Sequence, residues 1–310
     1  MNLPRIAMGA WAWGDSDGYF GNTMSGEEFH PIFDAAMKLG LNLWDTATAY
    51  SMGASEKILG SFVKDVKRED VLVSTKFTPQ MAGMYGNSVV KMCDASLERM
   101  GLDYIDVYWI HNAIGAPDWT RQLIPLLKDG KVKAVGVSNH NLAEIKEADA
   151  ILKDAGFRVS AVQNHFSLVN RSSETGGILD WCKENDVSFW GYMVLEQGAL
   201  SGKYDTAHPF PAGSARAEKY GPMLPAIEKV VAAMRPIAEA HQANIAQIPT
   251  AWAMTKGVLP IIGVTKVPQV EDAAKLAEIQ LTAAEMKTIE TAAAEAGVST
   301  IREWEKDMSR

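Results

Sequence analysis

The chain has 310 residues, of which 47% are hydrophobic and 22% charged, a balance typical of a soluble globular protein. Its formal net charge of −8 and the lack of a Lys/Arg-rich run argue against nucleic acid or an anionic membrane surface as a partner. The two cysteines, Cys93 and Cys182, are too few for a disulfide framework and wrongly spaced for zinc, so we expect no metal.

The N-terminal sequence and the hydropathy pattern indicate where the protein is located. The start, MNLPRIAMGAW, lacks a basic region followed by an apolar run, and no apolar stretch is long enough to span a bilayer. We therefore expect a cytoplasmic protein with no membrane contact. The length suits one α/β-barrel domain over residues 1–310, and nothing in the sequence indicates a partner chain, so we expect a monomer.

Short apolar runs rich in Val, Ile and Leu alternate with longer amphipathic segments. Continuous rather than alternating apolar runs are typical of strands that are covered on both faces. The predicted strands are Arg5–Gly9, Leu41–Asp45, Val71–Lys76, Ile105–His111, Lys133–Val137, Val159–Gln163, Val187–Tyr192 and Val258–Ile262.

Helical periodicity fills the intervals between these strands. The first helix carries an apolar stripe and ends at Gly40, a typical C-cap, and Asn141 with Glu144 predicts a capping box before the fifth. The predicted helices are Glu27–Leu39, Ser55–Phe62, Ser88–Met100, Trp119–Lys128, Leu142–Lys153, Thr175–Glu184, Met223–His241, Ala246–Lys256, Val270–Ala277 and Ala283–Ala296.

Eight alternations of strand and helix predict an α/β fold, the (β/α)8 TIM barrel. The alternative is a doubly wound sheet, which usually carries a Gly-rich phosphate loop after its first strand. The sequence contains no GxGxxG, which favours the barrel. Lys203–Pro222 is the one long irregular segment, and it is either a binding loop or a solvated insertion.

Polar residues at the strand ends indicate where chemistry would occur. In a barrel of this type, active sites lie at the C-terminal ends of the strands. Asp45, Lys76 and His111 end three successive predicted strands, so their side chains would face one mouth of the barrel.

Sequence blocks in the same regions resemble those of the aldo-keto reductases. LNLWDTATAYSMGASEKILG resembles the family signature: Asp-Thr-Ala, a Tyr five residues after the Asp, then Gly-x-Ser-Glu and a Gly. VLVSTKF, SLERMGLDYIDVYWIHN, VKAVGVSNHNLAEI, VQNHFSLVNR, YMVLEQGALSGKY and PIIGVTK resemble the later blocks in the same order, and the resemblance covers residues 3–295. It implies a (β/α)8 oxidoreductase that reduces aldehydes or ketones to alcohols by hydride transfer from NADPH.

The resemblance places the family's four catalytic residues on Asp45, Tyr50, Lys76 and His111. Tyr50 would donate the proton to the carbonyl oxygen, although a free phenol with a pKa of about 10 is a poor acid at neutral pH. The ammonium of Lys76 would lower that pKa, and Asp45 would hold Lys76 charged. His111 would polarise the carbonyl or relay a proton. Each residue alone has an ordinary structural explanation; the four together favour catalysis.

The resemblance also implies how the cofactor would bind. Ser138, Asn139 and Gln163 would hydrogen-bond the nicotinamide carboxamide, and Tyr192 would stack on the nicotinamide ring. The loop that wraps the pyrophosphate would contain Leu195, Gly198 and Leu200.

The segment that would bind the adenosine end departs from the family pattern. Thr265 and Lys266 match the positions that grip a 2′-phosphate, and Asp272 keeps the family's acid. However, Gln269 stands where an Arg is expected, and Ala273 replaces an Asn. One cation is retained and one is missing, so we expect NADP(H) to be preferred and NAD(H) to be used as well.

Aromatic residues are candidates to line the substrate pocket. Their number suggests an apolar or aromatic carbonyl substrate. The candidates are Trp11, Trp13, Tyr19, Phe20, Tyr85, Trp119 and residues of Lys203–Pro222, with Trp304 the one large aromatic residue of the C-terminal tail.

Two other classes of protein stay open from the sequence. Some relatives of the family keep the barrel and the cofactor but act as channel β-subunits. A metal-dependent barrel hydrolase would instead use His111, His140 and His165, which lie at or after three predicted strand ends. The sequence lacks the paired histidines after the first strand that such hydrolases need.

Overall fold

The computed structural model describes residues 3–14, 19–20 and 24–310. Within these ranges, each strand pairs in parallel with the next along the chain, and β8 pairs with β1 to close a barrel. The strands are β1 (Ala7–Gly9), β2 (Leu43–Asp45), β3 (Leu72–Phe77), β4 (Ile105–Ile110), β5 (Val132–Ser138), β6 (Ala161–His165), β7 (Ser188–Tyr192) and β8 (Leu259–Gly263). The predicted (β/α)8 barrel is confirmed, and the doubly wound alternative is wrong.

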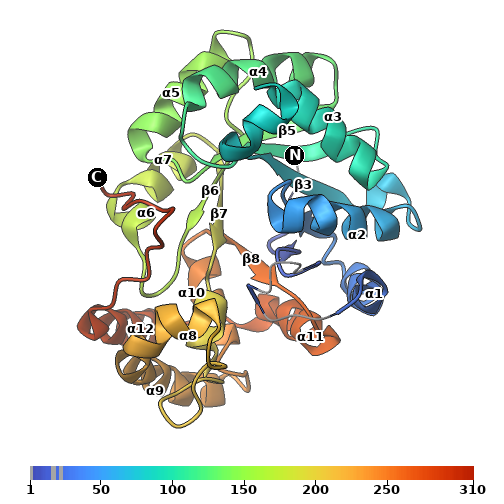
Figure 1. Ribbon diagram of the computed structural model, residues 1–310. Coiled ribbons are helices and arrows are strands. Elements are labelled where there is room, and N and C mark those ends of the chain that lie inside the picture. Colours follow the sequence, from blue (N-terminus) through green and yellow to red (C-terminus); the bar gives the residue numbers. More distant parts are fainter. Residues whose placement is uncertain (1–2, 15–18, 21–23) are drawn as a thin grey trace.

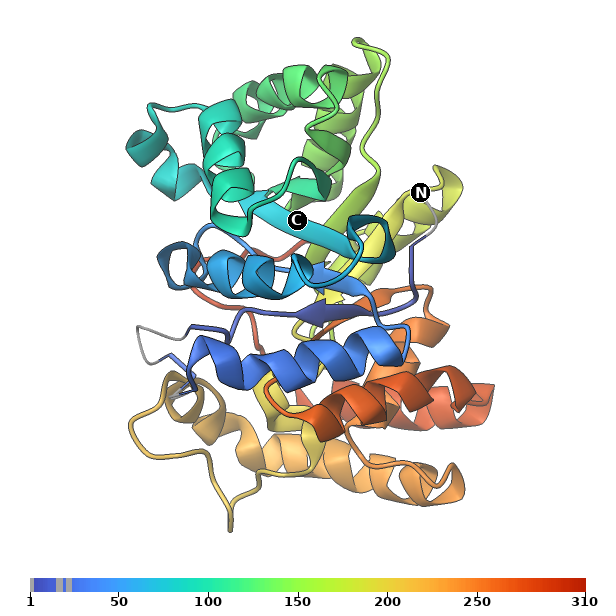
Figure 2. The ribbon, with the colours of Figure 1, turned by 90° about the vertical axis from the view of Figure 1, so that its right-hand side faces the viewer.

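The helices surround the strands, as the two perpendicular views show (Figures 1 and 2). They are α1 (His30–Lys38), α2 (Ala54–Val63), α3 (Val89–Met100), α4 (Ala116–Lys128), α5 (Leu142–Lys153), α6 (Ser172–Thr175), α7 (Ile178–Glu184), α8 (Ala215–Tyr220), α9 (Leu224–Ala240), α10 (Gln247–Thr255), α11 (Val267–Ala274) and α12 (Ala283–Ala296).

Two apolar cores support the barrel. The larger core fills the space between strands and helices. The smaller one joins residues of seven strands across the barrel interior, and in it the rings of Trp109 and Trp190 meet edge to face with centroids 5.0 Å apart. Trp109 Nε1 donates to Ser74 Oγ at 2.8 Å, which satisfies the one polar atom of its ring.

Several predicted elements have other bounds in the structure; for example, α4 begins at Ala116 and α11 at Val267, each three residues before the predicted start. The helix predicted over Thr175–Glu184 is interrupted by Gly177, whose φ of 73° is left-handed, so α6 and α7 form instead. The sixth strand begins two residues later than predicted, at Ala161. The irregular segment Lys203–Pro222 contains a short helix, α8, capped by the side chain of Ser214.

The C-terminal tail, residues 297–310, leaves α12 and returns past α6 towards α5, where Figure 1 places the end of the chain. Asn141 at the start of α5 donates to the backbone oxygen of Arg310 at 3.1 Å, and Lys306 pairs with Glu144. Met308 is buried, so the tail packs against the barrel as an ordered segment.

Among the described residues, no helix combines the length and apolarity needed to cross a membrane. The single domain over residues 1–310 and the monomeric state stay predictions.

Candidate active site

A buried ion pair lies where β2 and β3 end. Lys76 Nζ is 2.6 Å from Asp45 Oδ2 and also donates to the backbone oxygen of Thr46 at 2.7 Å. The other carboxylate oxygen of Asp45 accepts from Ser74 Oγ at 2.6 Å and from Gln163 Nε2 at 3.2 Å. Because every polar atom of the pair has a partner, two charges can remain buried without large cost.

Tyr50 lies next to this ion pair. Lys76 Nζ donates to Tyr50 Oη at 3.2 Å and lies 4.9 Å from the centre of the tyrosine ring. Burial of the phenol raises its pKa, while Lys76 acts in the opposite direction, and the outcome is a pKa above the ordinary value. The expected net lowering of the Tyr50 pKa is therefore wrong for the protein alone, and the hydroxyl stays protonated at neutral pH.

His111 follows β4 and faces the same mouth. Its ring centre is 6.0 Å from that of Tyr50, and its Nδ1 lies 3.1 Å from Thr78 Oγ1. Burial, together with the positive charge of Lys76, lowers the pKa of His111 to about 3. The imidazole is therefore neutral at physiological pH and carries its proton on only one nitrogen.

The Gly-x-Ser-Glu residues that follow Tyr50 in sequence stabilise the turn in which Tyr50 lies. Gly53 has a φ of 87°, and a side chain there would meet that of Arg99 at 2.8 Å, so the position requires glycine. Glu56 is fully buried, and accepts from Thr75 Oγ1 at 2.6 Å and from Arg99 Nε at 2.6 Å. Ser55 Oγ donates to the backbone oxygen of Ala10, the residue after β1, at 2.7 Å. The Gly-x-Ser-Glu pattern did not by itself indicate this supporting role.

The residues expected to face the nicotinamide meet beside His111. Asn139 has a left-handed φ of 59°, and its Nδ2 donates to the His111 backbone oxygen at 2.9 Å. Its Oδ1 accepts from Tyr192 Oη at 2.5 Å. Ser138 is buried next to it, whereas Gln163 points to Asp45.

The loop after β7 has an unusual backbone. Glu196, Gln197 and Gly198 all have positive φ, of 47°, 51° and 100°. Consecutive left-handed residues cost free energy, and such strain gathers at functional sites. Leu195 is half-buried there. Leu200, however, is fully buried and its backbone N–H donates to the Leu195 backbone oxygen, so neither its side chain nor this N–H is free to contact a cofactor in this structure.

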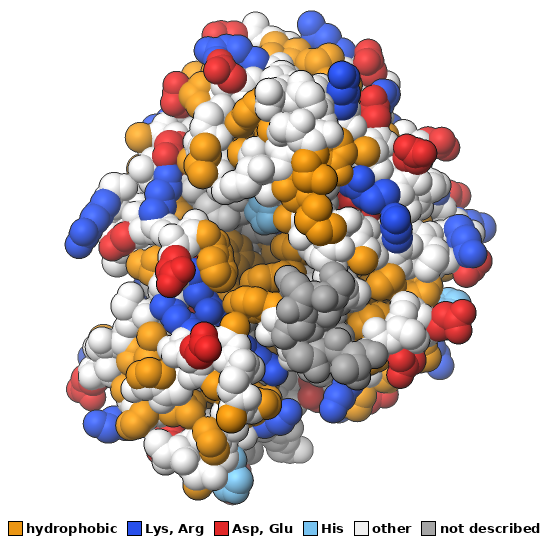
Figure 3. All heavy atoms as spheres, in the orientation of Figure 1, with side chains coloured by type: hydrophobic (Ala, Val, Ile, Leu, Met, Phe, Trp, Pro, Cys, Tyr) orange, Lys and Arg blue, Asp and Glu red, His pale blue; other side chains and the backbone are white. Residues whose placement is uncertain are grey.

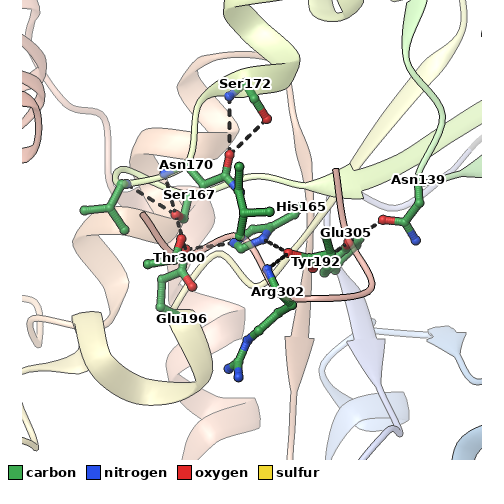
Figure 4. Close-up of polar contacts among 12 residues, drawn as sticks. Asn139, His165, Ser167, Asn170, Ser172, Tyr192, Glu196, Thr300, Arg302 and Glu305 are labelled. Atoms are coloured by element: carbon green, nitrogen blue, oxygen red, sulfur yellow. Dashed lines mark hydrogen bonds and ion pairs between the residues drawn. The ribbon is translucent and has the colours of Figure 1, made fainter. Parts of the chain in front are cut away.

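The side chain of Glu196 holds this loop. It is fully buried, and Figure 4 draws it beside Thr300, with Ser167 and His165 nearby. Its carboxylate accepts hydrogen bonds from His165 Nε2 at 2.8 Å, Ser167 Oγ at 2.5 Å, Thr300 Oγ1 at 2.8 Å and Tyr220 Oη at 2.9 Å. The sequence did not identify Glu196 as a functional residue, because no local sequence pattern predicts that a single glutamate will be buried.

The segment expected at the adenosine end is exposed after β8. Lys266 is exposed and Thr265 is half-buried. Gln269 Oε1 accepts from the backbone N–H groups of Thr265 and Lys266 at 2.7 and 3.0 Å. The residue that replaces the family's Arg therefore caps α11. Asp272 is half-buried at the end of α11.

The aromatic candidates separate into two groups. Trp11 stacks on Tyr50 with ring centres 5.7 Å apart, and Tyr19 and Phe20 contact Trp11. Trp13 is instead fully buried against Phe29 and Trp44, and its Nε1 donates to Val264, so the prediction that it lines the pocket is wrong in this structure.

Of the remaining candidates, Trp119 lies in the first turn of α4, after β4, and Tyr85 ends a 3-10 helix that follows β3. Trp119 packs on Phe77 and donates to Ile114, and Tyr85 accepts from Arg99. Arg216, in the segment predicted to be a binding loop or an insertion, donates to the Phe20 backbone oxygen at 3.3 Å. Figure 3 shows a hollow near the middle of this face, with hydrophobic side chains on its walls and a histidine inside it.

The three histidines of the hydrolase alternative do not meet in the structure. His140 Nδ1 donates to the Ser138 backbone oxygen, and burial lowers its pKa to about 4. His165 lies between Glu196 and Glu305. Within the described ranges, no group of three or more His, Cys, Asp or Glu side chains is arranged to hold a metal ion.

The charge of His165 gives a pH-dependent prediction. Burial opposes a charge on His165, but Glu196 and Glu305 outweigh it and raise its pKa from 6.5 to about 10. Because the pKa is raised on folding, the charged His165 contributes its full stabilisation of the folded state below pH 6.5. This stabilisation declines as the pH rises and is lost above about pH 10. We expect the difference in Tm between wild type and His165→Gln to narrow over this range. A difference that is constant with pH would contradict a charged His165.

A (β/α)8 barrel with titratable side chains gathered at its C-terminal mouth has the organisation of a barrel enzyme. The Aldo/keto reductase family model matches residues 5–294, and the chain therefore belongs to this family of oxidoreductases.

Individual relatives agree with this membership. The chain is 29% identical to a chloroplastic pyridoxal reductase of Arabidopsis thaliana, over 97% of this chain and 86% of the relative. It is 28% identical to an NADP(+) aldo-keto reductase of Schizosaccharomyces pombe, over 86% and 83% of the two chains. A glycerol dehydrogenase from Gluconobacter oxydans has the same fold, with a TM-score of 0.82 at 23% identity over 98% and 95% of the chains.

Proposed function

We propose that this protein reduces aldehyde or ketone carbonyls to alcohols with NADPH, with Tyr50 as the general acid. The observation that carries the proposal is the contact of Lys76 Nζ with both Tyr50 Oη, at 3.2 Å, and Asp45 Oδ2, at 2.6 Å. The protonated phenol can give its proton to a carbonyl oxygen, and the adjacent ammonium stabilises the phenolate that remains. Asp45 keeps that ammonium in place.

His111 would orient the carbonyl. If the Thr78 hydroxyl donates to Nδ1, the proton of the neutral imidazole is on Nε2. Nε2–H can then donate to the substrate oxygen beside Tyr50. Two donors aimed at one oxygen stabilise the negative charge that develops there.

The residues at the mouth fit a nicotinamide dinucleotide, which would supply the hydride when bound. Tyr192 is half-exposed, and its hydroxyl is fixed by hydrogen bonds, as suits a ring that stacks on nicotinamide. Ser138, Asn139 and Gln163 would bind the carboxamide. At the other end, Lys266 is exposed just before α11, so its ammonium is accessible to a 2′-phosphate.

The remaining cofactor contacts are proposed from the strained loop and from α11. Leu195 and Gly198 would lie along the pyrophosphate, and Thr265 and Asp272 beside the adenosine. Use of NAD(H), a cytoplasmic location and a monomeric state also stay predictions.

The substrate pocket would be lined by Trp11, Tyr19 and Phe20 near Tyr50, with Tyr85 and Trp119 on the rim. The stack of Trp11 on Tyr50 supports a flat, apolar or aromatic carbonyl. The pyridoxal reductase relative supports pyridoxal, an aromatic aldehyde, as a member of the test panel.

The test is NADPH consumption by purified protein with pyridoxal, benzaldehyde and small aliphatic aldehydes and ketones, with NADH in parallel. We expect turnover with NADPH on at least one aromatic aldehyde. Tight NADPH binding without turnover on any panel member would favour a regulatory β-subunit. Failure to bind either nucleotide would count against the proposed function.

A further inference from the structure

Arg302 in the C-terminal tail is a buried cation with an unpartnered hydrogen-bond donor. The residue is only 7% exposed, and a guanidinium stays charged at every physiological pH. Its Nη2 donates to Gln197 Oε1 at 2.6 Å, whereas its Nε is buried without a hydrogen-bond partner. The two buried carboxylates of the same cluster, Glu196 and Glu305, face His165 instead. Because burying a charge against a neutral amide is costly, Arg302 is suited to bind an anionic ligand.

Arg302 borders the strained loop after β7, along which the proposed function places the pyrophosphate of the cofactor. Its acceptor, Gln197, is followed in that loop by Gly198, and both have a left-handed φ, of 51° and 100°. Figure 4 shows the guanidinium of Arg302 pointing away from Glu305 and His165. The hydrogen bond to Gln197 therefore ties a positive charge from the C-terminal tail to this loop.

A second arginine, Arg216 of α8, approaches the same loop. Tyr204 lies 3.4 Å from the position that a Cβ of Gly198 would occupy, and its ring stacks on that of Phe210 with centres 4.0 Å apart. The Cζ of Arg216 is 5.9 and 5.6 Å from these two ring centres, and its Nε is also buried without a partner. The surroundings of the loop are therefore cationic, although the chain as a whole has a net charge of −8.

Aromatic rings connect the two arginines. The ring centre of Phe210 is 5.7 Å from that of Tyr220, and the Cζ of Arg302 lies 4.9 Å from the Tyr220 centre. Neutral rings attract a guanidinium and cover it from water, but they do not neutralise its charge. The charge of Arg302 is thus held in place beside the loop and can still act on an anion.

We propose that Arg302 binds the pyrophosphate of the nicotinamide dinucleotide. A diphosphate carries negative charge on both phosphates, and a planar guanidinium can donate two parallel N–H bonds to phosphate oxygens. Lys266 serves the 2′-phosphate at the other end of the cofactor. This inference rests on the proposed function, because it requires that a dinucleotide lies along Gly198. It gives the C-terminal tail a direct contact with the cofactor.

Arg302→Gln tests the inference with three ligands. NADPH contains both the pyrophosphate and the 2′-phosphate, NADH contains the pyrophosphate alone, and adenosine 2′-phosphate contains the 2′-phosphate alone. We expect Arg302→Gln to raise the Kd for NADPH and the Kd for NADH by the same factor, about tenfold, because a charge-assisted contact is lost. The Kd for adenosine 2′-phosphate should not change, which also shows that the variant is folded. Fluorescence titration and calorimetry would measure the three constants.

Arg310→Gln is the matched control. It removes the same charge from an exposed side chain at the end of the same tail, so all three Kd values should stay at the wild-type level. Arg302→Lys keeps the charge but loses the planar fork, and its Kd for each dinucleotide should lie between those of wild type and Arg302→Gln.

A Gln197→Ala background separates contact with the cofactor from support of the loop. This variant removes the acceptor of Arg302 and keeps the guanidinium. If Arg302 binds the pyrophosphate, Arg302→Gln should still weaken both dinucleotides by a similar factor in this background. If Arg302 acts only by holding Gln197, no further loss should occur, and the inference would be overturned.

Other outcomes would also overturn it. A loss for NADPH without a loss for NADH would place Arg302 at the 2′-phosphate, and an equal loss for all three ligands would indicate general damage. Unchanged Kd values in Arg302→Gln, when wild type binds both dinucleotides, would remove this inference alone. If wild type binds neither dinucleotide, the proposed function fails first, and this inference fails with it.

Discussion

Tyr50→Phe should lower kcat by about 10²–10⁴, the usual contribution of a positioned general acid. The ring that stacks on Trp11 remains, but the hydroxyl beside Lys76 and the proton it donates are lost. The Kd for NADPH should stay within about twofold of wild type, because a hydroxyl aimed at the substrate does little for the cofactor. Steady-state kinetics would measure kcat, and fluorescence titration would measure the Kd for NADPH.

Tyr104→Phe is the matched control for this prediction. Tyr104 lies before β4, at the opposite end of the barrel, where its ring contacts Arg68 and Lys133. That variant should keep wild-type kcat. Unchanged kcat in Tyr50→Phe would remove Tyr50 from the proposed chemistry, and an equal loss in both variants would indicate damage to the fold.

Lys266→Ala should produce the largest change in cofactor affinity. A hydrogen bond to a charged group is worth about 1.5–3 kcal/mol, so the Kd for NADPH should rise roughly 10- to 150-fold. The Kd for NADH should hardly change, since NADH lacks the 2′-phosphate. Gln269, which stands at the family's Arg position, is uncharged and caps α11, so it does not replace the lost charge.

Lys275→Ala controls for the loss of one positive charge near α11. Lys275 is exposed just after that helix and should leave both Kd values unchanged. Equal weakening of NADPH and NADH in Lys266→Ala would mean that Lys266 does not contact the 2′-phosphate. Titrations at two salt concentrations would show whether the effect is electrostatic.

The sequence predicted the barrel and the cluster of Asp45, Lys76 and His111 for a simple physical reason. The C-terminal ends of parallel strands meet at one mouth, so residues that end successive strands come together. The position of Tyr50 above Lys76 followed from the resemblance, since a loop residue has no such constraint.

Other features depend on contacts between distant parts of the chain. Glu305 contacts His165 and Tyr192 only because the C-terminal tail folds back on the barrel, and no sequence periodicity predicts this fold. The direction of the Tyr50 pKa shift depends on how deeply the phenol is buried, which sequence does not reveal. Trp13 was misassigned for a related reason: an aromatic residue in the first loop can point into the mouth or into the core.

The contact between Glu196 and Thr300 has a consequence for the order in which this protein is made. The strained loop after β7 is complete in sequence about a hundred residues before the tail that helps to hold it. During synthesis from the N-terminus, all eight strands and their neighbouring helices leave the ribosome before Thr300 and Glu305 do. Thr300 and Glu305 are therefore translated after every strand of the barrel, so they are added to a wall whose sheet is already complete.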